Sequence, residues 1–81
     1  MNSNVVHEEL RPADRLRWLR ALAGVAQYQL ARDSAVGRTR LSLAENGHVR
    51  LRPDEQRAVE TALLRAIERR AAEYRAALAG N

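Results

Sequence analysis

The chain has 81 residues, 46% of them hydrophobic, a net charge of +4 and no cysteine. This length allows one small domain with a thin core, since much of the hydrophobic content is alanine, and the lack of cysteine excludes disulfides, thiolate metal sites and a cysteine nucleophile. No apolar run is long enough to span a membrane and no signal peptide is recognisable, so we expect a cytoplasmic protein with no membrane partner.

Residues 1–11 are expected to form a flexible N-terminal tail, followed by a first helix. Proline is favourable at the first helical position, so this helix should begin at Pro12, and glycine often ends a helix, so it should end at Gly24. Its buried face would be formed by Leu16, Leu19 and Ala23. Trp18 and Leu22 lie on a neighbouring face, where they could pack against either the N-terminal tail or a C-terminal helix.

Residues 27–47 have the pattern of two short helices joined by a tight turn, which is a helix-turn-helix. The first helix directs Leu30 and Ala31 inward, and the turn after it places Val36 in the core. The second helix, from about Arg38 to Asn46, buries two side chains three residues apart. These are Leu41 and Ala44, and Gly47 then stops the helix.

The exposed side of this second helix offers guanidinium, hydroxyl and aliphatic groups, which read base edges in a major groove. The distribution of charge also favours nucleic-acid binding by this segment. Residues 37–52 contain four arginines and one glutamate, whereas residues 53–81 contain equal numbers of basic and acidic residues. A positive excess on this helix and the following loop is typical of a surface that binds phosphates. The sequence therefore predicts a DNA-binding helix-turn-helix.

A long final helix should begin at Pro53, which two acids follow in the first turn. No glycine or proline occurs from there to Ala79. We therefore expect one helix of about 25 residues, with a kink near Ala66 as the alternative. The side chains of this helix that close the core would be Val59, Leu63 and Ala66.

A second apolar stripe of this helix has the 3, 4, 3, 4 spacing of a heptad repeat. It consists of Leu64, Ile67, Ala71, Tyr74 and Leu78. Because this stripe extends past anything that the small domain could cover, it predicts a homodimer formed by the C-terminal helices. The alternative is that the helix folds back over Trp18 and Leu22 of its own chain.

Over residues 16–63 the chain resembles the Cro/repressor-type (xenobiotic-response-element-like) helix-turn-helix family of DNA-binding proteins. The residues that fill the family pattern without a gap are Leu16, Leu19, Arg20, Gly24, Val25, Gln27, Leu30, Ala31, Val36, Leu41, Glu45 and Gly47. Two positions depart from it, because Ala35 stands where the turn usually has glycine, and Gly37 where a serine or threonine usually caps the recognition helix. The resemblance implies an all-α fold, a small helix-turn-helix bundle of four to five helices, in which residues 12–64 would be the DNA-binding domain. The family usually breaks its fourth helix near residue 65, so the long C-terminal helix is predicted from this sequence alone, with residues 65–81 as a helical extension for dimerisation.

The resemblance also implies roles for individual residues. Arg20 should form an ion pair with Glu45 and so join the first helix to the end of the recognition helix. The residues expected at base edges are Gly37, Arg38, Thr39 and Leu43. The residues expected at phosphates are Gln27, Arg40, Ser42, Asn46, His48 and Arg50.

We therefore expect a transcription regulator that binds double-stranded DNA, most simply a repressor on a palindromic operator. The alternatives are an antitoxin, whose long helix would bind a toxin, and a protein-interaction adaptor that has kept the fold without DNA binding. His7 and His48 are the only histidines and no acidic pattern accompanies them, so we expect no metal, no cofactor and no enzymatic activity.

Overall fold

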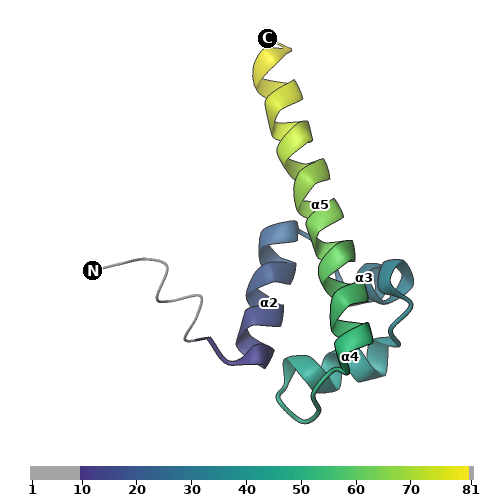
Figure 1. Ribbon diagram of the computed structural model, residues 1–81. Coiled ribbons are helices and arrows are strands. Elements are labelled where there is room, and N and C mark those ends of the chain that lie inside the picture. The colour runs from purple at the N-terminus through teal and green to yellow at the C-terminus, as the bar shows by residue number, and fades with distance from the viewer. Residues whose placement is uncertain (1–9, 81) are drawn as a thin grey trace.

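The computed structural model describes residues 10–80, and within this range it contains only helices. They are α2 (Pro12–Ala23), α3 (Gln27–Ser34), α4 (Arg38–Glu45) and α5 (Pro53–Ala79). The first three gather around the lower half of α5, and the upper half of α5 projects beyond them (Figure 1). The predicted all-α bundle with a long C-terminal helix is confirmed. The expected N-terminal tail lies, as far as residue 9, outside the described residues.

The first helix begins and ends where the sequence predicts. Pro12 occupies its first turn, and Gly24 adopts a left-handed φ of 70° while its N–H donates to the carbonyl oxygen of Arg20 at 3.0 Å. A Cβ at this position would meet only the flexible end of Arg70 on α5, which can move aside. The left-handed φ is therefore what favours glycine here.

The turn between α3 and α4 is held by a serine hydroxyl. Ser34 Oγ donates to the carbonyl oxygen of Leu30 at 2.6 Å and accepts from the N–H of Val36 at 3.2 Å. Between them Ala35 has a φ of 60°, a left-handed conformation that is strained for a residue with a Cβ. Val36 is buried, as predicted, and the buried side chain of Ser34 supports the backbone on both sides of Ala35.

The core lies where α5 packs against α2 and α3, and α4 closes it by packing on the same two helices. Its buried apolar residues are Leu16, Ala23, Leu30, Val36, Leu41, Ala44, Val59, Ala62, Leu63 and Ala66. They include the predicted stripe of α5 and the predicted inward residues of α4. Four of these ten are alanine, which buries little area, so the helices pack closely around a thin core.

The final helix is continuous over 27 residues, or about 40 Å at 1.5 Å per residue. It passes through Ala66 without interruption, and Ala66 is itself buried in the core, so the kinked alternative is not observed. Helix α4 is one residue shorter than predicted, because Asn46 is its C-cap, and Gly47 follows with the expected left-handed φ of 78°.

The left-handed conformation of Ala35 predicts the effect of a substitution on the free energy of unfolding. Ala35→Gly should stabilise the fold by about 1 kcal/mol, because glycine adopts this φ without steric cost. Chemical denaturation of both proteins measures the difference. Ala72→Gly, at an exposed position inside α5, is the matched control and should destabilise by a similar amount. If both glycines destabilised the chain, the strain at Ala35 would not exist.

Candidate nucleic-acid interface

A buried carboxylate fixes the end of α4 against α2. The side chain of Glu45 is only 4% exposed, and its two oxygens accept hydrogen bonds from two nitrogens on one edge of the Arg20 guanidinium. Arg20 Nε lies 2.6 Å from Oε2 and Arg20 Nη2 lies 3.0 Å from Oε1. This two-point geometry sets the orientation of the two helices as well as their separation. The predicted ion pair is confirmed.

Two further side chains complete the surroundings of Glu45. Gln27, in the first turn of α3, donates from Nε2 to Oε1 of Glu45 at 3.0 Å. Arg17 of α2 donates to the backbone carbonyl oxygen of Glu45 at 2.9 Å. The sequence-based prediction gave Gln27 a phosphate contact, whereas the structure uses its amide to join α3 to this carboxylate. Helices α2, α3 and α4 thus meet at one acid.

A second acid holds the start of α5 to α4. Arg40 donates from Nε to Glu55 Oε2 at 2.6 Å, and the N–H of Arg52 donates to Oε1 of the same carboxylate at 2.8 Å. The hydrogen bond from Arg40, followed by that from the backbone of Arg52, lowers the pKa of Glu55 to about 2. The same pairing raises the pKa of Arg40. Glu55 is therefore ionised at neutral pH and acts as a fixed anchor for both segments.

Arg40 also reaches the loop that follows α4. Its Nη2 lies 3.4 Å from the carbonyl oxygen of Arg50. Sequence reasoning placed Arg40 among the phosphate contacts, but this guanidinium is directed inward at Glu55 and at the loop backbone. Nothing in the pattern of 37–52 indicated the pairing, because its acid lies fifteen residues away across an irregular loop.

The outer side of α4 carries the side chains predicted at base edges. Arg38 and Thr39 are exposed, and Leu43 is 38% exposed, which is large for a leucine of a short helix beside the core. Gly37 precedes them in open space, where even a Cβ would meet nothing. Within residues 10–80 the side chains of Arg38 and Arg50 form no hydrogen bond or ion pair, in contrast to that of Arg40.

The remaining predicted phosphate contacts surround this side. His48 is exposed in the loop, and its backbone N–H donates to the carbonyl oxygen of Leu43. Asn46 is exposed and donates from Nδ2 to the carbonyl oxygen of Ser42 at 2.8 Å, while Ser42 is half-buried. The structure thus brings these residues together at the end of α4.

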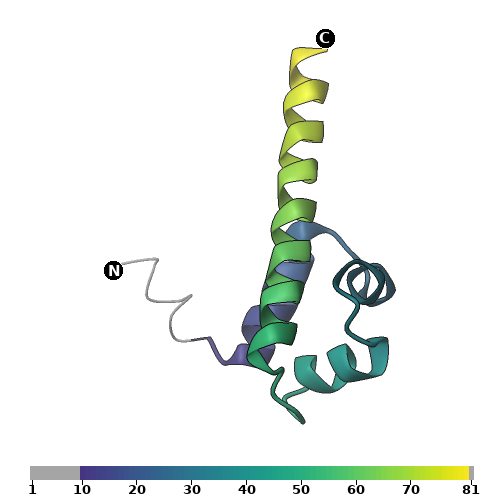
Figure 2. The same cartoon turned by 45° about the vertical axis from the view of Figure 1, so that its right-hand side comes forward.

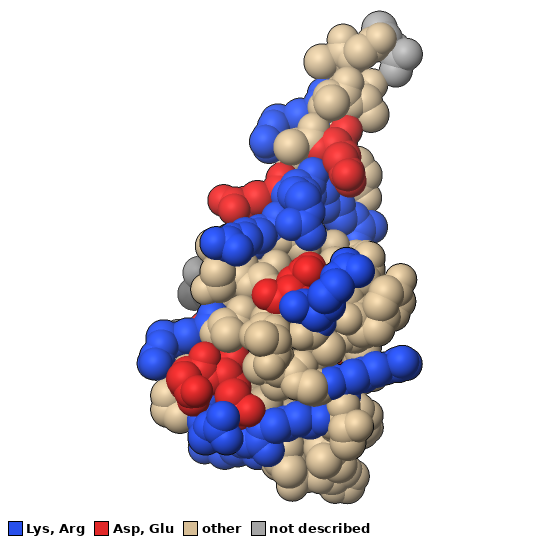
Figure 3. Space-filling model, turned by 90° about the vertical axis from the view of Figure 1, so that its right-hand side faces the viewer, with Lys and Arg blue, Asp and Glu red and all other residues tan. Residues whose placement is uncertain are grey.

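Charge over the wider surface is mixed. Figure 3 shows the side of the molecule on which α3 lies in Figure 1, and arginines there alternate with acids from the base to the upper part of α5. The cationic character of residues 37–52 is therefore local. It depends on Arg38 and Arg50, because Arg52 lies 3.4 Å from Asp54 and Arg40 is paired.

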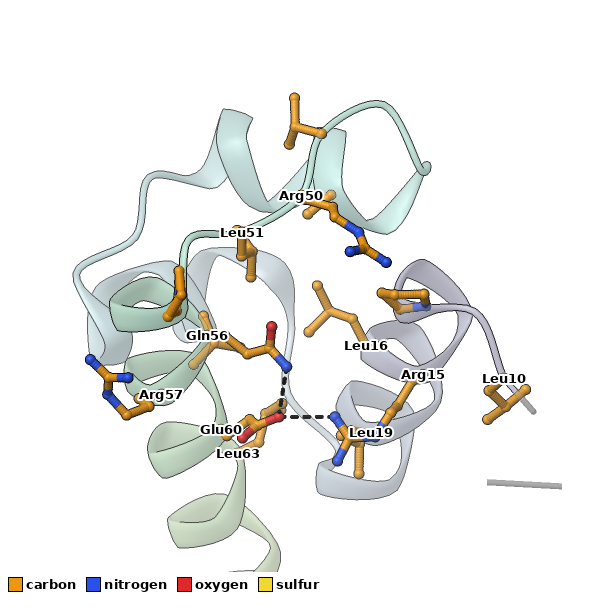
Figure 4. A pocket seen from close by; sticks show the side chains of 15 residues that line it. Leu10, Arg15, Leu16, Leu19, Arg50, Leu51, Gln56, Arg57, Glu60 and Leu63 are labelled. Carbon is orange, nitrogen blue, oxygen red and sulfur yellow. Dashed lines mark hydrogen bonds and ion pairs between the residues drawn. The ribbon is translucent and has the colours of Figure 1, made fainter. Parts of the chain in front are cut away.

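A groove of about 710 Å³ opens elsewhere, between α2, the start of α5 and the loop before it (Figure 4). Leucines line it, including Leu10, Leu19 and Leu51. Arg15 donates to Glu60 across its mouth at 2.9 Å, and this contact lowers the pKa of Glu60. Arg50, one of the predicted phosphate contacts, also lines the groove, and the carboxylate of Glu60 is paired with Arg15.

Other kinds of site find little support in the described residues. No group of three or more histidine, aspartate or glutamate side chains among residues 10–80 is placed to hold a metal ion. In the same part of the chain no helix is long and apolar enough to cross a membrane. Comparisons with family models, with curated proteins and with solved structures found no match to this chain. The resemblance to the Cro/repressor-type family therefore stays a prediction from the residues quoted above.

The Arg20–Glu45 pair should contribute measurably to stability. Glu45→Ala would leave a partly buried guanidinium without its carboxylate, so we expect a loss of more than about 1 kcal/mol, above the usual value for surface pairs. A double-mutant cycle with Arg20→Ala, read by urea denaturation, measures the coupling. The exposed Arg15–Glu60 pair is the control and should show less coupling. Equal coupling in both cycles would contradict the anchoring role.

The pairing of Glu55 predicts a dependence of stability on pH. Its pKa is about 2 in the folded chain, below the ordinary value of 4.5, so its stabilising effect is complete above about pH 5 and is lost as pH falls toward 2. The difference in unfolding free energy between the wild type and Glu55→Gln should therefore shrink over that interval. Glu73→Gln, at an exposed position of α5, is the control. A difference for Glu55→Gln that did not change with pH would refute this assignment.

Proposed function

We propose that this chain is a sequence-specific DNA-binding transcription regulator, most simply a repressor that binds a palindromic operator as a homodimer. One observation carries the proposal. The inner side of α4 is fixed by Leu41, Ala44 and Glu45, while its outer side presents side chains that make no competing contacts within residues 10–80. A rigid helix with an uncommitted arginine on its outer side is suited to insertion into a major groove.

Three side chains of α4 are proposed to read base edges. Arg38 has the planar donor fork that pairs with guanine, Thr39 offers a hydroxyl, and Leu43 offers an apolar surface to a thymine methyl group. Gly37 supports a close approach, because it has no side chain and its surroundings are open. The backbone at the start of α4 can therefore come near a groove wall without a steric barrier.

Phosphate contacts are proposed to come mainly from the end of α4 and the loop after it. Arg50 and His48 are exposed there, with Ser42 and Asn46 beside them. The contacts around Glu55 and Glu45 support a revised role for Arg40 and Gln27, which would position the loop and α3 and leave phosphate binding to their neighbours. Phosphate contacts set the register on DNA, and contacts to base edges supply the sequence preference.

The proposal separates two arginines by their effect. Arg38→Ala should weaken operator binding by about 1–3 kcal/mol and relax the preference at one base pair. Arg50→Ala should weaken binding to all sequences alike and reduce the steepness of the salt dependence by about one unit. Affinities measured over a panel of operator variants at several salt concentrations distinguish these outcomes. Arg69→Ala, on α5 away from the interface, is the control, and identical behaviour of all three variants would contradict the proposal.

A further inference from the structure

From Leu64 to Leu78, helix α5 carries a row of five apolar side chains, three of which residues 10–80 leave largely uncovered. The other two, Ile67 and Ala71, are partly buried, and Ile67 packs against the core. We call this row the seam, and its members are Leu64, Ile67, Ala71, Tyr74 and Leu78. Leu64 and Tyr74 are 57% and 58% exposed, and Leu78 is 83% exposed. Single exposed leucines are common, but a continuous apolar row on a projecting helix marks an interaction surface.

Helix α2 packs on the same side of α5 as the seam and ends part-way along it. Glu60, which lies one heptad before Ile67, is bonded to Arg15 of α2. The last turn of α2 lies level with Arg70, whose Nη1 donates to two of its carbonyl oxygens at 3.3 and 3.4 Å. Arg70 also donates to the hydroxyl of Tyr74 at 3.2 Å. Above this level α5 stands apart from the other described helices (Figures 1 and 2).

We propose that the seam pairs with the seam of a second copy of this chain and that the two α5 helices run antiparallel. This deepens the homodimer of the proposed function by assigning the orientation of its partner. The first reason is the space that α2 leaves for a second helix along the seam. A parallel helix seated on the seam would run down into the α2 that occupies that side. An antiparallel helix reaches toward α2 only with its own C-terminal turn.

The register follows from the spacing of the seam. An antiparallel pairing that sets Ile67 opposite Leu78 of the second copy also sets Ala71 opposite Tyr74. In this register the second α5 ends level with Ile67, so its C-terminal turn lies beside the last turn of α2. Tyr74 would then lie over the small side chain of Ala71, which leaves room for its ring. Large and small residues therefore alternate across the interface.

Charge gives the second reason. Glu68 and Arg75 are exposed and lie seven residues apart, so they share one flank of the seam. In an antiparallel two-fold pair equal flanks face each other, and each Glu68 then lies beside Arg75 of the second copy. In a parallel pair opposite flanks meet, and Arg75 would face Arg70 instead. Because a two-fold interface must be complementary to itself, this pattern indicates a second copy of the same chain.

Charge reversal tests the orientation in full-length protein without DNA. Arg75→Glu should raise the dissociation constant of the dimer about tenfold, because it places like charges together at two symmetric points. Glu68→Arg should do the same, and the double reversal should restore the affinity. Sedimentation at micromolar concentration measures each, and circular dichroism confirms the helix content. Arg69→Glu, away from the seam, is the control and should leave the dissociation constant unchanged.

Disulfide trapping gives a second measurement, which the absence of native cysteine makes clean. Under mild oxidation a mixture of Ile67→Cys and Leu78→Cys chains should yield the mixed disulfide, while Leu78→Cys alone should cross-link weakly. Efficient self-cross-linking of Leu78→Cys, together with tighter association of Arg75→Glu, would establish the parallel pair and overturn the proposal. A wild-type protein that is monomeric at micromolar concentration would overturn it as well.

The outcome is separable from that of the proposed function. If the antiparallel pairing failed while Arg38→Ala still relaxed operator preference, only the orientation would be wrong. If the antiparallel pairing were observed while the chain showed no salt-sensitive affinity for DNA, the dimer proposal would be supported and the proposed DNA-binding function would be contradicted.

Discussion

The carboxylate of Glu45 is the point on which the arrangement of α2, α3 and α4 depends. A charge that is almost fully buried is tolerated only when donors surround it, and here Arg20 and Gln27 supply them from two different helices. Each of these two hydrogen-bonding partners restricts the orientation of α4, because a rotation that broke its contact would leave the buried carboxylate poorly satisfied. The small alanine side chains of the core interdigitate little, so apolar packing restricts the helix orientations less. Orientation in this fold therefore comes from polar contacts more than from apolar packing.

The helices were predictable from sequence because their signals are local. Pro12, Gly24 and Pro53 mark helix boundaries, and the apolar spacing of α5 identifies its buried face. The pair of Arg20 with Glu45 was accessible through the family resemblance. The pair of Arg40 with Glu55 was not, because it depends on the path of an irregular loop, and neither was the hydroxyl of Ser34 beneath Ala35. Interactions that depend on loop geometry leave no periodic signal in the sequence.

The charge of a segment and the charge that it can offer to a partner differ in this molecule. Residues 37–52 contain four arginines, yet Arg40 and Arg52 lie against acids at the start of α5. Only two guanidinium groups of that segment remain without a hydrogen bond or ion pair among residues 10–80. An electrostatic footprint deduced from sequence counts therefore overstates the surface potential. The structure shifts the emphasis to Arg38 and Arg50.

The uninterrupted course of α5 has a mechanical consequence. One end of this helix lies in the core beside α4, and the other end carries the seam, with no glycine, proline or loop between them. No helix break therefore separates the seam from the part of α5 that lies in the core. Arg70 also connects the junction to the last turn of α2 through two backbone carbonyl oxygens. A partner bound at the far end of α5 would therefore be held at a fixed distance and angle from α4, whatever that partner is.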